Sequence, residues 1–476
     1  MNKKDFPKIH FYDQDFVDLY DKTWALIGDY WHQNANNKNS DGFFLYSYDD
    51  DAVIDQYETI FSTFFLVYSN KNYASCTGLD YFYKRQEENG AIRNKYKIRT
   101  CEPVIYPDNP EGLSMPLFAW AEYNIYHKSG NKKRVKEVLP ILIRYTKWIE
   151  ATFKAENGLY KSPLASANMG NVPRQKAAYL IDFNAAMAIN ALYVSALGDI
   201  LNDKETTFQY KKTYFSIKTR ISLLMWNDED SFYYDLDEDG KQLKKKTLAT
   251  FWALLAEIPN VDKAASLISH LENPTLFASE HPFPSLAICE HEYSEVGAGY
   301  CGSVFPILNF VVIKGLEHYE KWELAREYAM RHVYYILGTM SPPEGTKEPG
   351  YLWEAYMPSK DGKAVWTGNP NFPRKQYVIT AGLSTITLMI ENIIGLIISL
   401  PRKTVDWTIP VLELMGVENL SLKRNFITIV ASKSMRGWEI HMESEKLYYF
   451  TLHILNVKKK TLPIPSGKCS MFIDKI

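Results

Sequence analysis

The feature that most constrains the fold is a long series of helix-forming segments. Apolar residues recur with a helical period in about twelve stretches of the chain. These stretches span 13–34, 57–69, 72–87, 115–129, 132–155, 183–202, 204–226, 246–257, 262–272, 303–318, 320–338 and 378–398. Stops such as Asn89-Gly90 and Asn157-Gly158 separate them, as expected of helix hairpins. No fixed short period links the pairs, which argues against a solenoid of repeats.

The loops between these segments are unequal in length. The long loops fall after every second helix, at 35–56, 88–114, 157–182, 273–302 and 340–377. In a double ring of helices this spacing places the long loops on one face, where binding and catalytic residues concentrate. We therefore predict an all-α (α/α)6 barrel, a toroid of six helix hairpins, over residues 1–400.

The end of the chain has a different pattern. After Pro401 the segments become short, β-rich and alternating, as at 426–430 and 448–452. We expect residues 401–476 to form a small β-sandwich domain.

Charge and composition exclude several classes of protein. The chain has 476 residues, of which 46% are hydrophobic and 23% charged, so it can bury a large core. Its 54 basic and 56 acidic residues are intermixed, and the net charge of -2 predicts no nucleic-acid partner and no anionic membrane surface. The one membrane-like stretch, 381–400, contains Glu391 and Asn392 in its middle, which favours a buried barrel helix.

The cysteines and the first residues indicate the compartment. Residues 1–16 contain no apolar stretch of the kind that an export signal needs. The five cysteines are odd in number, widely spaced and without a CxxC pair, which suits free thiols in the cytoplasm: Cys76, Cys101, Cys289, Cys301 and Cys469.

Acidic residues in the long loops are the candidates for chemistry. Glycoside hydrolysis needs two carboxyl groups, one acid and one base or nucleophile. The segment GYLWEAYMP at 350–358 places Glu354 among aromatic side chains, which would desolvate the carboxyl and offer stacking faces for a sugar. Glu354 is therefore the strongest candidate for a functional carboxylate.

Short segments in a fixed order strengthen this interpretation. They are QYETIF (56–61), QEENG (86–90), SMPLFAW (114–120), IDFNA (181–185), PSL (284–286) and GYCGSVFP (299–306). In order and spacing they resemble the family that includes trehalases, processing α-glucosidases and mannosylglycerate hydrolases, over nearly the whole chain. The resemblance implies an (α/α)6 glycosidase in which Glu354 is the general base.

The same comparison shows where the chain departs from the family. The family's general-acid aspartate lies in a segment that resembles ANMGNVPR at 167–174, and Gly170 occupies its place. Cys301 replaces an arginine implied to contact the sugar, and Tyr57-Glu58 replaces a tryptophan-aspartate pair. Glycine cannot donate a proton. Either Asp182 or Glu58 supplies the acid instead, or catalysis is lost, although the family motif implies that Asp182 caps a helix.

The remaining site predictions concern the sugar, metals and cofactors. The acidic segment at 290–295 fits neither an HExxH nor an EF-hand spacing, so we expect a solvated loop, no metal site and no cofactor. The residues expected to contact a small carbohydrate substrate are Tyr57, Trp120, Arg174, Tyr300, Gly302, Phe305, Tyr351, Trp353 and Trp366.

Three functions fit the sequence. The first is an inverting glycosidase that acts on a small α-linked disaccharide or glycoside, with Glu354 as general base. The second is a catalytically impaired or inactive sugar-binding homologue, for which Gly170 and Cys301 argue. The third, a sugar epimerase or lyase, would want paired His or Tyr residues, and the ten histidines show no such pairing in the matched loops.

Overall fold

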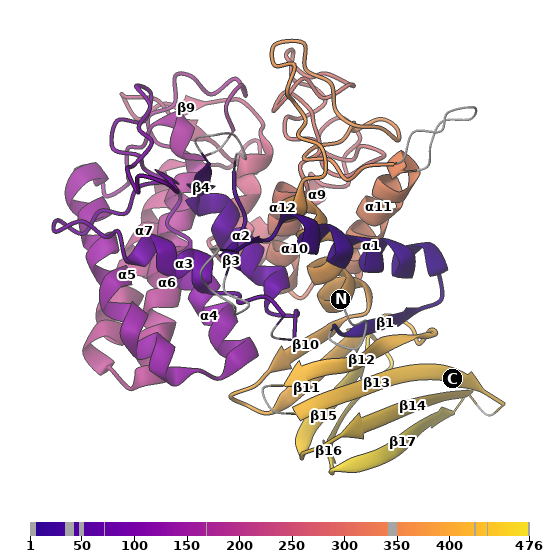
Figure 1. Cartoon of the computed structure of the whole chain (residues 1–476). Helices are drawn as coiled ribbons and strands as arrows, with labels where there is room; N and C mark the ends of the chain where they lie inside the picture. Colours follow the sequence, from indigo (N-terminus) through magenta and orange to yellow (C-terminus); the bar gives the residue numbers. More distant parts are fainter. Residues whose placement is uncertain are drawn as a thin grey trace.

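The computed structural model describes residues 6–33, 42–46, 52–70, 72–167, 169–340, 350–422, 425–435 and 437–474. Helices form one part of the molecule and a β-sheet region forms the other (Figure 1). The N-terminal strand β1 (Lys8–Phe11) joins the β region as one edge of a sheet, and the last strand, β17 (Gly467–Asp474), forms the other edge of the same sheet.

Every one of the predicted helical segments contains a helix. The helices of the outer set are α1 (Gln14–Tyr30), α3 (Thr77–Tyr83), α5 (Lys132–Phe153), α7 (Lys204–Leu224), α9 (Val261–Ser269) and α11 (Trp322–Met340). Those of the inner set are α2 (Gln56–Leu66), α4 (Phe118–Ser129), α6 (Ile181–Leu201), α8 (Trp252–Leu255), α10 (Pro306–His318) and α12 (Val378–Gly382). The 3-10 turn η2 (Leu248–Phe251) precedes α8, the π-helical turns η3 (Leu383–Thr387) and η4 (Met389–Ile393) continue α12, and the short 3-10 helix η1 is Leu164–Ala167.

The inner helices form a closed ring. Going round the ring, α2 contacts α4, then α6, α8, α10 and α12 follow, and α12 contacts α2 again. Every residue of α2 and α12 is buried, as expected of helices enclosed on all sides. The outer helices are amphipathic, and α9 buries only Ala264, Leu267 and Ile268. This arrangement is the predicted (α/α)6 barrel.

Aromatic side chains fill the centre of the ring. Phe64 packs against Trp120 with ring centroids 4.4 Å apart and against Phe310 at 5.3 Å. Phe61 contacts the same two rings edge-on. Because this cluster fills the middle of the barrel, only the two ends of the ring can hold a cavity.

Helix caps fix where the helices begin and end. Asp55 Oδ1 accepts from the Glu58 backbone N–H at 2.9 Å and caps α2. Gly130, with φ of 64°, ends α4 in the left-handed conformation, and Asn202 ends α6 in the same way. Each of the long loops leads into the N-terminal end of an inner helix.

The C-terminal region consists of two sheets. One has the strand order β1 (Lys8–Phe11), β12 (Met415–Leu422), β13 (Asn425–Ser434), β14 (Gly437–Ser444), β17 (Gly467–Asp474). The other has the order β10 (Leu396–Ser399), β11 (Thr404–Ile409), β15 (Tyr448–Ile454), β16 (Lys458–Ile464). Only β11 and β15 pair in parallel among these strands. Alternate residues of both sheets, such as Trp407 and Ile429, belong to one buried cluster.

Two strands of these sheets come from outside the segment expected to be β-rich. The helix predicted to reach residue 398 ends at Ile393, because Gly395 adopts a φ of 88° and the chain turns into β10. Strand β1, near the N-terminus, was not predicted, and it pairs antiparallel with β12, with Lys8 opposite Glu418.

The remaining strands are short hairpins in the loops. They are β2 (His32–Gln33) with β3 (Gly42–Phe43), β4 (Val53–Asp55) with β5 (Lys95–Lys97), β6 (Trp226–Asn227) with β7 (Phe232–Tyr233), and β8 (Asp235–Leu236) with β9 (Gln242–Leu243). Of the described helices, α6 alone is long and apolar enough to cross a membrane, and most of that helix is buried inside the ring.

Candidate active site

A cavity of about 530 Å³ lies at the end of the barrel where the inner helices begin. Its walls come from the long loops and from the first turns of α2, α10 and α12. Six of the residues selected from the sequence line it: Tyr57, Glu58, Tyr300, Phe305, Glu354 and Trp366.

Arg374 joins the two candidate carboxylates of the cavity. Its Nη2 atom donates to Glu354 Oε1 at 2.8 Å and to Glu58 Oε1 at 2.8 Å. Its guanidinium also lies over the rings of Tyr46, at 4.7 Å, and Tyr377, at 4.1 Å. The long loop that contains Glu354 and Arg374 is thus joined at one nitrogen atom to the distant inner helix α2, which carries Glu58.

Glu354 is fixed by backbone as well as by side-chain contacts. Its N–H donates to the carbonyl oxygen of Arg374 at 3.0 Å, and the Arg374 N–H donates to Glu354 Oε2 at 3.0 Å. The side chain is 16% exposed, so the carboxylate reaches the cavity without being free in solvent. A carboxylate has about four lone-pair sites, so Glu354 can still accept a proton from a water molecule.

Glu58 lies deeper than Glu354. It sits in the first turn of α2, directly after the N-cap Asp55, and is 7% exposed. Burial raises the pKa of the Glu58 carboxyl, and the nearby Arg374 opposes this change by lowering the pKa. The Tyr377 hydroxyl also hydrogen-bonds to Glu58. Because Glu58 is fixed in this way, it holds Arg374 in position.

Aromatic rings form another wall of the cavity. Tyr300 stacks on Phe305 with centroids 4.1 Å apart and planes 8° from parallel. Phe372 continues this wall, 5.9 Å from Phe305 and 6.0 Å from Trp366. Burial is the largest cause of the raised pKa values of Tyr300 and Tyr57, so both hydroxyls are neutral donors at neutral pH. Flat rings with polar edges suit the faces of a sugar.

Gly170, which the sequence resemblance aligns with the general acid of the family, lines the cavity. A Cβ atom added there would meet no atom within 4 Å. Asn171 fixes the loop, because its Oδ1 accepts from the Tyr300 N–H at 2.6 Å and its Nδ2 donates to Ala298 O at 2.8 Å. The neighbouring Asn168 lies outside the described residues.

Cys301 and Gly302, in the matched segment 299–306, do not line the cavity. Cys301 donates from Sγ to the Asn171 carbonyl oxygen at 3.4 Å, and burial raises the pKa of its thiol. Gly302 has a φ of 142°, and a Cβ there would meet Ser294 O at 2.4 Å. Gly302 is thus required by the backbone, which corrects its assignment as a sugar contact.

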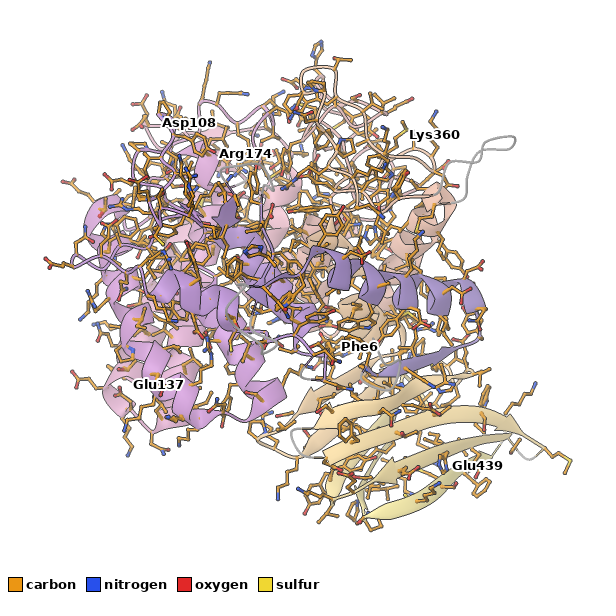
Figure 2. All side chains as sticks on the ribbon, viewed as in Figure 1. Phe6, Asp108, Glu137, Arg174, Lys360 and Glu439 are labelled. Atoms are coloured by element: carbon orange, nitrogen blue, oxygen red, sulfur yellow. The ribbon has the colours of Figure 1, made fainter. Side chains whose placement is uncertain are left out.

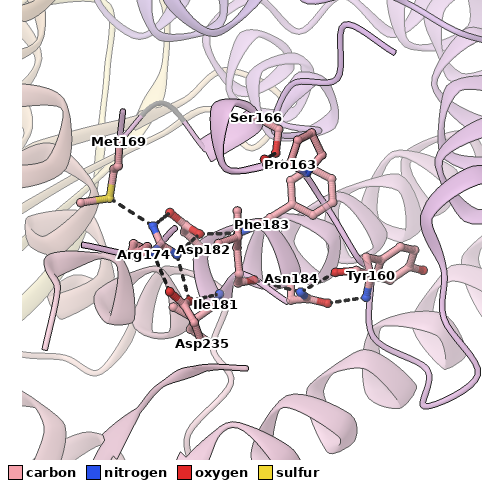
Figure 3. A network of polar contacts seen from close by, with 11 residues as sticks. Tyr160, Pro163, Ser166, Met169, Arg174, Ile181, Asp182, Phe183, Asn184 and Asp235 are labelled. Atoms are coloured by element: carbon pink, nitrogen blue, oxygen red, sulfur yellow. Dashed lines mark hydrogen bonds and ion pairs between the residues drawn. The ribbon is translucent and has the colours of Figure 1, made fainter. Parts of the chain in front are cut away.

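Arg174 and Asp182 belong to a buried ion-pair cluster. The Arg174 guanidinium donates to both oxygens of Asp182, each at 2.8 Å, and to those of Asp235 at 2.6 and 2.9 Å (Figure 3). Asp235 Oδ1 also accepts from the N–H of Ile181 at the start of α6. Arg174 is found among the loops above the inner helices (Figure 2), and its side chain is 1% exposed. These contacts correct two predictions, since neither Arg174 as sugar contact nor Asp182 as acid lies on the cavity.

Three aromatic residues expected to contact the sugar also lie elsewhere. Trp120 belongs to the aromatic cluster inside the ring and lines a second cavity, of about 290 Å³, at the other end of the barrel. Tyr351 and Trp353 contact each other edge-on at 5.9 Å and are covered by lysine ammonium groups, Lys375 over Tyr351 at 3.5 Å and Lys363 over Trp353 at 4.6 Å. They support the Glu354 loop from outside.

Several residues of the cavity were not identified from the sequence: Tyr46, Lys95, Asn369, Asn371, Phe372, Arg374 and Tyr377. Arg374 stands in the same long loop as Glu354, so a search for a cation in that loop would have found it. Lys95 has no such signal, because it reaches the cavity through the pairing of β5 with β4.

No metal ligand set is present among the residues that the structure describes, where three or more His, Cys, Asp or Glu side chains would have to come together. In the acidic segment at 290–295, Glu290 and Glu292 pair with Lys245 at 3.1 and 2.7 Å.

The families that match this chain follow its division into a helical part and a β-rich part. Residues 70–373 match the mannosylglycerate hydrolase MGH1-like glycoside hydrolase domain. The chain belongs to this glycoside hydrolase family. Residues 395–476 match the trehalase C-terminal domain, which begins at β10.

Individual proteins are also similar to this chain over most of its length. An uncharacterized protein of Borreliella burgdorferi is 50% identical over 478 residues, which cover 100% of both chains. The GH63 mannosylglycerate hydrolase of Thermus thermophilus, in complex with glucose, is 16% identical over 77% of this chain and 99% of that one, with a TM-score of 0.60. The neutral trehalase of Saccharomyces cerevisiae is 13% identical over 75% of this chain and 76% of that one, with a TM-score of 0.57. At these identities the two structures show the fold alone.

Proposed function

We propose that the protein hydrolyses a glycosidic bond by inversion, with Glu354 as the general base that activates water. The observation that supports this most is the position of Glu354, which faces a cavity walled by Tyr300 and Phe305 at the N-terminal ends of the inner helices. The family membership and the mannosylglycerate hydrolase among the structural neighbours support a small glycoside as substrate.

Glu58 is not the partner of Glu354 in an inverting pair. Both carboxylates contact Arg374 Nη2 at 2.8 Å, so the two contacting oxygens are at most twice that distance apart. Inverting glycosidases need about 6.5 to 9.5 Å between their carboxyl groups, with substrate and water in between. Here the guanidinium occupies that space. We propose that Glu58 holds Arg374 and, with it, the position of Glu354.

The experiment that tests the proposal is the replacement Glu354→Gln, which keeps the size of the side chain and removes its basicity. Activated aryl glycosides are the substrates of choice, because their leaving groups need little protonation. We expect kcat to fall by about 10²-fold or more, the contribution typical of acid–base catalysis, with an unchanged circular dichroism spectrum. An unchanged kcat would remove Glu354 from the mechanism.

A second function, sugar binding without turnover, is favoured by one observation, namely that Gly170 leaves the acid position empty of any proton donor. The same aryl glycosides separate the two functions. A hydrolase that lacks its acid cleaves them, whereas a binding protein shows heat of sugar binding in calorimetry and no release of the aryl group.

A further inference from the structure

We infer that the substrate is a glycosyl phosphate, a sugar whose anomeric oxygen carries a phosphate group, and that Lys95 binds this phosphate. The inference rests on the proposed function of Glu354 and names the class of substrate. It follows from two properties of the cavity as far as its residues are described: no free carboxyl group is available to protonate a leaving group, and the ammonium group of Lys95 has no hydrogen-bond acceptor.

The first property concerns the acidic residues among the described residues of the cavity, which are Asp55, Glu58 and Glu354. Asp55 is 5% exposed and is used as the N-cap of α2. Glu58 and Glu354 are held by the same nitrogen of Arg374. At Gly170 the space is open and no side chain fills it. Among the described residues of the cavity, no free carboxyl group is therefore available to protonate a departing oxygen.

The second property concerns Lys95, whose side chain is 12% exposed and lines the cavity. Pairing of β5 with β4 places it directly opposite Asp55. The nearest carboxylate oxygen, Asp55 Oδ2, is 3.7 Å from Nζ, which is too far for a hydrogen bond. Nζ instead lies 3.6 Å from the centroid of the Tyr46 ring. Within the described residues, three N–H donors of a largely buried ammonium group are left for a ligand.

Lys95 is also held in its charged form. Burial lowers the pKa of the ammonium group, but attraction by Asp55 is one of several contacts that together raise the pKa above its ordinary value. Helix α10 adds to the positive potential, because it begins at the cavity with Phe305 and has no side-chain cap. Free N–H groups at helix starts favour anions.

A phosphate leaving group makes a general acid unnecessary. An alcohol leaves with a conjugate-acid pKa near that of water, about 15.7, and needs a proton in the transition state. A phosphate ester has a second pKa of about 6, so its singly protonated form already carries a proton and leaves as the hydrogen phosphate dianion. A cation beside it stabilises the charge that develops, as donors in an oxyanion hole do.

The reaction balances without another reactant. The oxygen of a water molecule attacks the anomeric carbon while Glu354 takes one of its protons. The bond between the anomeric carbon and the phosphate oxygen breaks, and its electron pair stays on the phosphate. The products are the free sugar and inorganic phosphate, and Glu354 returns its proton to solvent.

The test compares three leaving groups on the same sugars. Glucose, mannose and galactose 1-phosphates are incubated with the protein beside the matching dinitrophenyl and methyl glycosides, and phosphate, dinitrophenol and free sugar are measured. We expect turnover of a 1-phosphate and of its dinitrophenyl counterpart, and a methyl glycoside slower by about 10²-fold or more.

The variant Lys95→Met removes the charge and keeps the length of the side chain. We expect its kcat/KM to fall by about 10-fold or more on the 1-phosphate and to stay within about two-fold on the dinitrophenyl glycoside. The control is Lys363→Met, which removes a lysine that covers Trp353 outside the cavity and should change neither rate. Phosphate release in the double variant Lys95→Met, Gly170→Asp should stay low, because an acid cannot replace the cation.

Each failure has its own meaning. Turnover of dinitrophenyl glycosides without any 1-phosphate, or an equal loss on both substrates in Lys95→Met, overturns the inference and leaves the proposed function standing. If no glycoside of any kind is cleaved, the proposed function and the inference fail together.

Discussion

Arg174 and Arg374 each hold two carboxylates, and of these two arginines only Arg374 lies in the candidate active site. Arg174 uses Nε, Nη1 and Nη2 to bind Asp182 and Asp235, and its side chain is 1% exposed. Arg374 binds Glu58 and Glu354 through the single atom Nη2, and its side chain is 31% exposed. Its Nη1 has no acceptor among the described residues.

The difference separates a closed ion-pair cluster from one that keeps free groups beside a cavity. In the Arg174 cluster every oxygen of both aspartates is used, and solvent is excluded, so the cluster can only stabilise the loops around α6. In the Arg374 cluster the geometry leaves lone pairs on Glu354 and a donor on Arg374, beside an open cavity. Residue type and spacing in the sequence do not distinguish the two cases.

The largest effect that we expect from mutating these two clusters is a loss of stability. Arg174→Met leaves Asp182 and Asp235 buried without a cation, which typically costs about 3 to 5 kcal/mol. We expect the free energy of unfolding, from urea denaturation, to fall by this amount. A loss below about 1 kcal/mol would show that the cluster is not the rigid support that its burial implies.

The corresponding change in the other cluster should act mainly on activity. Arg374→Met frees Glu58 and Glu354 to repel each other and to move, and a displacement of about 1 Å can cost about 10²-fold in rate. We expect kcat on an aryl glycoside to fall by about that factor, with a smaller stability loss than in Arg174→Met.

The matched control is lysine at both positions. Because Arg374 uses one nitrogen for both carboxylates, the point charge in Arg374→Lys should restore most of the activity, whereas Arg174→Lys cannot reproduce a fork that binds two carboxylates. Equal tolerance of lysine at both positions contradicts the distinction.

A carboxylate added beside the Arg374 cluster should raise activity. Gly170→Asp has room for its side chain, since no atom lies within 4 Å of the added Cβ. General acids contribute about 10² to 10⁴-fold, so we expect kcat/KM on an unactivated disaccharide to rise by about ten-fold or more. No gain, with sugar binding intact by calorimetry, would favour the binding function.

The smallest effect is the pH dependence of Glu58. Because its folded-state pKa is raised, Glu58 contributes stability that is fully present below its unfolded pKa and is lost as pH rises through the folded pKa. Glu58→Gln removes this dependence, so the variant should gain stability relative to wild type between about pH 4.5 and pH 7. Urea denaturation at the two pH values measures it, and a difference independent of pH contradicts the assignment.

The barrel was predicted well because the signals for a helix lie in residues that are close together in the sequence. The apolar period and the turn residues found every helix of the ring, and the unequal loops placed the cavity on the correct face. The errors arise where partners are distant. The apolar stretch at 378–398 was predicted to be one helix, but β10 begins after Gly395. Leu396–Ser399 form a strand because they pair with β11, which the local pattern does not reveal.

The site was predicted in part for the same reason. Glu354, Glu58, Tyr57 and Tyr300 lie in ordered segments that resemble the family, and they line the cavity. Arg174 matches the family as well, but a sequence match cannot tell that Asp235 lies against its guanidinium. Lys95 could not be found at all, since a two-strand pairing and one ring contact place it.

The pairing of β1 with β12 has a consequence for how the protein is made. Lys8–Phe11 are synthesised some 400 residues before their partners at Met415–Glu418. At about 5 to 20 residues per second the strand waits on the order of tens of seconds with its hydrogen-bonding groups unpaired. The hydrogen bonds within α1 can form meanwhile, but its packing partners α11, α12 and η3 also come late in the sequence. Strand β1 therefore joins its sheet only after β12 has been made, and until then it exposes an unpaired edge.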